Sequence, residues 1–115
     1  MNILITGATR GIGKAIASLF NNKDYRLFVT GRNEDLLKEY KNYCVADLAT
    51  IEGMTKLGKY IQENKIDILI NNAGEYIYTP AIDGFEISKL EHITRLNLEA
   101  PLYLVSKAVK NMKEN

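Results

Sequence analysis

The chain has 115 residues, enough for one domain with a modest hydrophobic core. Its hydrophobic share of 46% and charged share of 25% are those of an ordinary globular protein, and a net charge of +1 favours neither nucleic acid nor an anionic membrane as partner. The apolar runs are too short to span a bilayer, no signal peptide is expected before the first strand, and a single cysteine, Cys44, excludes an internal disulfide. These features predict a cytoplasmic protein.

A glycine-rich turn near the start of the chain is the most informative stretch. Ile3-Leu4-Ile5 predicts a short buried strand, and it leads into Thr6-Gly7-Ala8-Thr9-Arg10-Gly11-Ile12-Gly13. Apolar residues then follow at the spacing of one helix face, namely Ile12, Ala15, Ile16, Leu19 and Phe20. Glycines here let a phosphate approach the backbone, while the helix N-terminus offers unpaired N–H groups and a partial positive charge. The turn therefore predicts nucleotide binding, with an ordinary tight turn as the alternative.

Three further strands are predicted, over residues 25–30, 43–46 and 66–70. Helices are expected between them over 34–40, capped by Asn33, and over 51–63. A last helix is expected from Lys89 nearly to the end of the chain, opened by a capping box of Ser88 and Glu91 and bent near Pro101.

Alternating strands and helices predict an α/β fold, with a Rossmann-type parallel sheet and helices on both faces. Ligands bind beyond the carboxyl ends of the strands in such sheets. Residues 6–13, Gly31-Arg32 and residues 71–74 all follow predicted strands, so we expect them to share one edge of a single domain over 1–115.

The spacing G-x-x-x-G-x-G, together with Asn71-Asn72-Ala73-Gly74 after the fourth strand, resembles the short-chain dehydrogenase/reductase family over the whole chain. The resemblance implies a pyrophosphate loop of Thr6, Gly7, Gly11, Ile12 and Gly13, an adenine contact from Asp47 and Leu48, and a ribose-lining segment of Asn72, Ala73 and Gly74. Thr9 and Arg10, in the same turn, are also expected to bind the cofactor. It also implies that Asn97 is the asparagine that holds a water in the family's proton relay.

Simpler alternatives stand beside these roles. Asp47 could cap the turn that follows it, Asn72 and Gly74 could serve turn chemistry alone, and the Asn97 amide could bond a neighbouring backbone.

The choice between NADP and NAD depends on charge. NAD-specific Rossmann sites keep a carboxylate about 20 residues past the glycines, where it accepts the ribose hydroxyls. Here that place holds Gly31 followed by Arg32, and Arg10 adds a second cation. Two guanidiniums with no acid at that place suit a 2′-phosphate, so NADP is predicted over NAD, unless both arginines are solvated surface charges.

Hydride transfer between NADP(H) and an unidentified carbonyl or alcohol is the reaction that the resemblance implies. The predicted strand order 3-2-1-4 is the first part of the order 3-2-1-4-5-6, and the family's catalytic serine and Y-x-x-x-K motif lie on later elements. Tyr103 and Lys107 have that spacing, but on one helix Tyr103 points about 120° away from Asn97, so we interpret them as a packing pair. His92 has no partner in the sequence and is interpreted as a surface or packing histidine.

These 115 residues are therefore expected to be a cofactor-binding portion that is truncated after the helix following the fourth strand and inactive alone. A non-catalytic NADP(H)-binding module and one half of a split enzyme are the alternatives. Strand 66–70 would be an edge with only Asp67 as a polar residue, so self-association or a completing chain is expected. No metal, nucleic acid or membrane is expected as a partner.

Overall fold

The computed structural model describes residues 1–76, 84 and 86–112. Its elements in chain order are β1 (Asn2–Thr6), α1 (Gly11–Phe20), β2 (Arg26–Gly31), α2 (Glu34–Leu37), β3 (Tyr43–Val45), α3 (Ile51–Glu63), β4 (Ile68–Ile70), α4 (Ile87–Thr94), a π-helical segment (Arg95–Glu99), α5 (Ala100–Ala108) and a 3-10 turn (Val109–Asn111). The strands are parallel, in the order β3-β2-β1-β4. The predicted fold class and strand order are confirmed.

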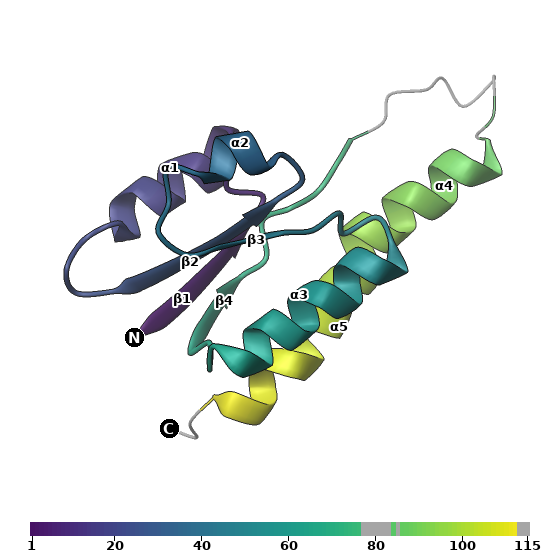
Figure 1. Cartoon of the computed structure of the whole chain (residues 1–115). Helices are drawn as coiled ribbons and strands as arrows, with labels where there is room; N and C mark the ends of the chain where they lie inside the picture. The colour runs from purple at the N-terminus through teal and green to yellow at the C-terminus, as the bar shows by residue number, and fades with distance from the viewer. Residues whose placement is uncertain (77–83, 85, 113–115) are drawn as a thin grey trace.

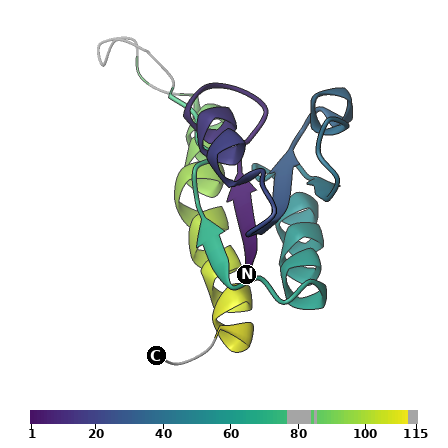
Figure 2. The same cartoon turned by 90° about the vertical axis from the view of Figure 1, so that its left-hand side faces the viewer.

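The sheet is a central layer covered on both faces (Figure 1). Because successive strand residues point to opposite faces, β1 divides its side chains between two cores. Ile3 and Ile5 belong to the core that α1 and α2 cover. Leu4 belongs to the core on the other face, which α3 and α5 cover (Figure 2).

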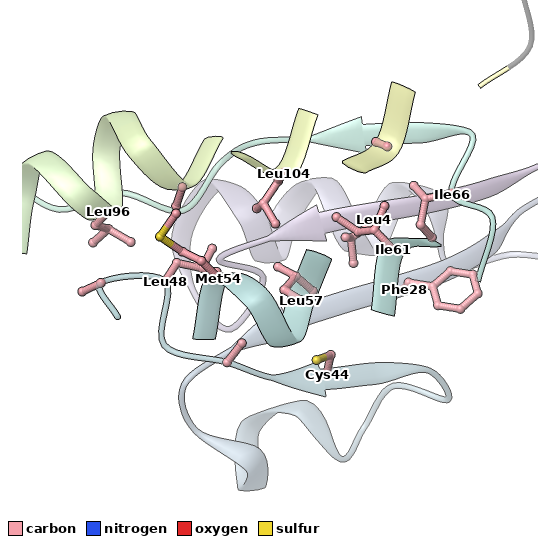
Figure 3. Packing of buried hydrophobic residues seen from close by; sticks show 14 residues of the cluster. Leu4, Phe28, Cys44, Leu48, Met54, Leu57, Ile61, Ile66, Leu96 and Leu104 are labelled. Atoms are coloured by element: carbon pink, nitrogen blue, oxygen red, sulfur yellow. The ribbon is translucent and has the colours of Figure 1, made fainter. Parts of the chain in front are cut away.

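The larger core lies between β1, α3 and α5. In Figure 3, Leu57 of α3 and Leu104 of α5 point into this space beside Leu4. Cys44 is buried at its margin, as a small core residue, and burial raises the pKa of its thiol. Burial also raises the pKa of Tyr60, whose ring meets Phe28 edge-on in the same core, to about 12. These shifts belong to the packed interior.

The register brings the ends of three strands to one level. Thr6 of β1 pairs with Thr30 of β2, and Ile5 of β1 pairs with Ile70 of β4. The segments that leave these strands therefore start side by side, which positions the site described below.

The last helix differs most from its prediction. The capping box is wrong: α4 begins at Ile87, its N-cap is Glu86 without a side-chain cap hydrogen bond, and Ser88 lies inside the helix.

The second helix is also shorter than predicted, although the Asn33 side chain does cap it by accepting from the backbone N–H of Asp35 at 3.0 Å. No helix of the described residues is long and apolar enough to cross a membrane.

A π-helical segment stands where a bend near Pro101 was predicted. The backbone N–H of Ala100 donates to the carbonyl of Arg95, five residues earlier. Pro101 has no N–H to offer the carbonyl of Asn97, and its ring crowds that carbonyl. The wider turn ahead of the proline accommodates both effects, and Leu96 within it is buried in the larger core.

Candidate functional site

A cleft of about 310 Å³ lies beyond the carboxyl ends of the strands. Every residue predicted to bind a cofactor lines it except Thr6 and Gly13; these are Gly7, Thr9, Arg10, Gly11, Ile12, Arg32, Asp47, Leu48, Asn72, Ala73 and Gly74. Thr30, Gly31, Ala46, Glu75 and Leu96 also line it. The structure thus gathers residues from four separate loops into one cleft.

Two glycines shape the turn after β1 for different reasons. Gly7 has a φ of +67°, which L side chains rarely adopt, and a Cβ there would lie 2.9 Å from the Cα of Ala73. Gly13 lies beneath the turn, where a Cβ would overlap the Gly7 carbonyl and the Asn72 side chain. Gly13 therefore supports the cleft from behind, by letting α1 pack closely on the turn.

The N-terminus of α1 carries no side-chain cap. Its N-cap residue, Arg10, makes no cap hydrogen bond, whereas α2 is capped by Asn33 and α3 by Thr50, whose Oγ1 accepts from the N–H of Gly53 at 2.9 Å. Space beside Gly11 is open, with no atom within 4 Å of a Cβ built there. The first N–H groups of α1 thus face a cleft, which is the arrangement that holds phosphate groups.

Asn72 and Thr6 join the ends of β4 and β1. The Asn72 side-chain Nδ2 donates to the carbonyls of Thr6 at 3.2 Å and Gly7 at 3.1 Å. In return, the buried Thr6 Oγ1 accepts from the backbone N–H groups of Asn72 and Ala73, both at 2.9 Å. The Asn72 side chain therefore supports a distant segment, beyond the chemistry of its own turn.

Asp47 serves the turn after β3 and also lines the cleft. Its Oδ1 accepts from the backbone N–H of Ala49 at 3.0 Å, and its carbonyl accepts from the N–H of Thr50 at 3.1 Å. One carboxylate oxygen of Asp47 thus makes the turn-capping hydrogen bond that the simpler alternative expected. The N-cap of α3 itself is Thr50.

Asn97, the predicted relay residue, lies outside the residues that line the cleft. Its amide holds both backbone groups of Glu75: Oδ1 accepts from the N–H at 2.9 Å and Nδ2 donates to the carbonyl at 2.8 Å. The amide thus bonds the backbone of a segment 22 residues away in the chain.

Glu75 is a cleft residue that the motifs do not predict. Its Oε1 lies 3.4 Å from Arg32 Nη1, and its Oε2 lies 2.8 Å from His92 Nε2. Folding therefore adds two contacts that the sequence does not indicate: Glu75 lies beside Arg32, although no acid directly follows β2 in the chain, and Glu75 is a partner for His92. Both arise because folding brings the segment after β4 to residues far away in the chain. The only signal in the sequence is that Glu75 directly follows Gly74.

Tyr103 and Lys107 form a packing pair, in agreement with the prediction. The Lys107 Nζ lies 5.2 Å from the centre of the Tyr103 ring, and that ring lies against Gly58 of α3, where a Cβ would come within 2.8 Å of it. Neither residue lines the cleft.

Comparisons with known proteins place the whole chain in one family. The short chain dehydrogenase family model matches residues 1–115. The chain is 28% identical to an uncharacterized oxidoreductase of Staphylococcus aureus, over 96% of this chain and 52% of that protein. It is 36% identical to a 3-oxoacyl-(acyl-carrier-protein) reductase of Rickettsia felis, over 97% and 48%.

Among solved structures, the fold resembles a short-chain dehydrogenase from Sphingobium yanoikuyae in complex with NADPH, with a TM-score of 0.80 and 26% identity over 95% of this chain and 47% of that one. The chain spans about half the length of the curated relatives it matches. With the cleft, the parallel sheet and the match over its full length, the chain belongs to the short-chain dehydrogenase family.

Proposed function

We propose that this chain binds NADP(H), as the cofactor-binding part of an oxidoreductase that transfers hydride between NADP(H) and a carbonyl or alcohol. The uncapped N-terminus of α1, facing a cleft behind the Gly7 turn, is the observation that carries the proposal. The residues that would hold the cofactor are those lining the cleft, with Gly13 behind them. The nicotinamide of the cofactor would supply the hydride chemistry. The residues of the cleft would bind and orient the adenosine and pyrophosphate of the same cofactor.

Arg10 and Arg32 support NADP over NAD. Both line the cleft, and neither Gly31 nor Arg32 supplies the carboxylate that NAD sites keep after β2. A guanidinium makes bidentate, charge-assisted hydrogen bonds to phosphate, which gives the 2′-phosphate a partner that NAD cannot use.

We expect these 115 residues to bind cofactor without turnover by themselves, in the cytoplasm. Asn97 is the one residue of the family's proton relay that they carry, and it is proposed as the catalytic-site residue of the whole oxidoreductase. A non-catalytic NADP(H)-binding module is the second candidate.

The test of cofactor choice is calorimetric titration with 2′-phospho-AMP and with AMP. The unmutated chain should prefer the phosphorylated ligand, and Arg32→Ala should remove that preference. Arg26→Ala is the matched control, because Arg26 begins the same strand at its other end, where its guanidinium lies 5.2 Å from the Phe28 ring. Equal affinities for both ligands in the unmutated chain would overturn the NADP assignment.

Turnover is tested by following NADPH oxidation with a panel of carbonyl compounds. No oxidation is expected. Oxidation that Tyr103→Phe abolishes would show that Tyr103 is not merely a packing residue.

The apolar surface around β4 and α5 suggests that a further polypeptide segment packs on it in the complete oxidoreductase. β4 is an edge strand, and its Ile68, Leu69 and Ile70 are half-buried. The Asp67 carboxylate does not protect that edge from pairing with another chain, because its Oδ2 accepts from the backbone N–H of Asn2 on the β1 side. On the helices, large apolar side chains are exposed at Ile87, Leu90, Leu98, Leu102, Val105 and Val109. We infer that a completing chain covers this surface, with a second copy as the other outcome.

Light scattering across a range of concentrations tests this surface. The chain alone should self-associate, and a Leu102→Lys/Val105→Lys variant should associate less, since both residues are exposed on α5. A monomer at high concentration that melts cooperatively would overturn the inference.

A further inference from the structure

The ion pair between Arg32 and Glu75 crosses the cleft. Arg32 follows β2 and Glu75 follows β4, and in the sheet β1 lies between these two strands. Both residues line the cleft, together with the Gly7 turn at the end of β1. The pair therefore joins two sides of the space in which a ligand would lie.

Glu75 is the more firmly held partner. Asn97 bonds both of its backbone groups, His92 bonds its Oε2, and only 28% of its side chain is exposed. The Arg32 side chain is 56% exposed. Glu75 thus stays in place and directs the guanidinium, while the guanidinium can turn to another anion.

We propose that Glu75 is a specificity-determining residue of the cofactor site, because its carboxylate competes with the 2′-phosphate of NADP for Arg32. The proposal rests on the proposed function. To bind Arg32, the 2′-phosphate must displace the Glu75 carboxylate from the guanidinium, and it then lies near the negative charge of that carboxylate. NAD carries no 2′-phosphate and makes no such exchange. Glu75 therefore lowers the preference for NADP below what Arg32 alone would give.

His92 lowers the cost of this exchange. It bonds the second carboxylate oxygen of Glu75, so that oxygen keeps its partner when Arg32 turns away. The carboxylate is then still hydrogen-bonded, which a partly buried charge requires.

Glu75→Gln is the direct test, measured as the ratio of the dissociation constants of AMP and 2′-phospho-AMP. The ratio should rise about two- to fivefold, as expected for removing a competitor from a partly exposed ion pair. The change should come from tighter binding of 2′-phospho-AMP, with AMP affected little. Glu63→Gln is the matched control: it removes the same charge from an exposed glutamate, 3.8 Å from Lys59 on α3, and should leave the ratio unchanged.

A second variant and a second background make the test specific. Glu75→Asp keeps the charge but shortens the side chain by one methylene, so it should raise the ratio by less than Glu75→Gln. In an Arg32→Gln background, Glu75→Gln should no longer change the ratio, because the residue for which the two anions compete is gone.

Several outcomes would overturn the proposal. An unchanged or lower ratio in Glu75→Gln means that Glu75 does not compete, and an equal loss of affinity for both ligands means that it serves the ribose or the fold. If the unmutated chain prefers 2′-phospho-AMP but Glu75→Gln does not alter the ratio, this inference fails and the proposed function stands. If the unmutated chain binds neither ligand, both fail.

Discussion

The two walls of the cleft are held by different kinds of interaction. At the end of β1, the wall consists of backbone in a glycine turn, tied by Thr6, which is 1% exposed. The second wall is formed by the side chains of Arg32 and Glu75, which come from either side of β1 and are paired across the cleft, with His92 bonded to Glu75; all three side chains are partly exposed. A buried polar group that loses its partner costs about 1–3 kcal/mol, whereas an exposed ion pair contributes about 0–1 kcal/mol. The first wall therefore decides whether the cleft forms, and the second tunes what it binds.

Gly13→Ala should break the first wall most severely. A methyl group at Gly13 would overlap the Gly7 carbonyl and the Asn72 side chain, so the free energy of unfolding should fall by about 3 kcal/mol. Urea denaturation measures this loss. Gly11→Ala is the control in the same loop, where φ is +60° but space is open, and should cost about 1 kcal/mol. Equal losses for both variants would contradict the packing argument.

Thr6→Val should show how much the buried tie between β1 and β4 contributes. Valine keeps the shape but leaves the N–H groups of Asn72 and Ala73 without their acceptor, so about 2 kcal/mol of stability should be lost. Thr30→Val is its matched control on β2: Thr30 is equally buried, and its Oγ1 donates to the Cys44 carbonyl alone at 2.6 Å. Thermal denaturation should rank Thr6→Val well below Thr30→Val, and the reverse order would refute the comparison.

Asn97→Ala should act on the second wall with a smaller effect on stability. Its two hydrogen bonds to Glu75 are exposed, so about 1 kcal/mol should be lost, and the ratio of AMP to 2′-phospho-AMP dissociation constants should shift as Glu75 loosens. Asn42→Ala removes a comparable bond, from Nδ2 to the Leu27 carbonyl at 3.2 Å, outside the cleft. It should lower stability without shifting the ratio. A shift in both variants would mean that the ratio reports stability.

Arg10→Ala should change stability least, by under about 0.5 kcal/mol, because the Arg10 side chain is exposed. Its effect should be on binding, as a loss of a few-fold in affinity for 2′-phospho-AMP when one cation leaves the cleft. Lys14→Ala, an exposed cation on α1, is the comparison. Equal losses from both variants would mean that net charge alone attracts the ligand.

Local patterns in the sequence predicted the fold well where a single segment holds the information. The apolar strand at Ile3-Leu4-Ile5 and the helix over Ile51–Glu63 are both present. Both could be predicted because the spacing of apolar residues within one segment indicates which faces of a strand or helix are buried. The capping box at Ser88 failed because a four-residue motif does not specify where a helix begins. The π-helical segment before Pro101 was not predicted, since proline indicates a disturbance but not its form.

The sequence by itself determined the glycine turn of the first wall, because the glycine spacing, the strand before it and the helix after it are contiguous, and Gly7 and Gly11 adopt positive φ. The contacts of this turn with Asn72 and Ala73 come from the tertiary structure. Only the tertiary structure decided the second wall. Glu75 meets Arg32 and His92 across gaps of 43 and 17 residues, so no local pattern records these contacts. The charged residues of the cleft meet because the sheet brings the ends of β2 and β4 to one edge, and this arrangement of strands exists only after folding.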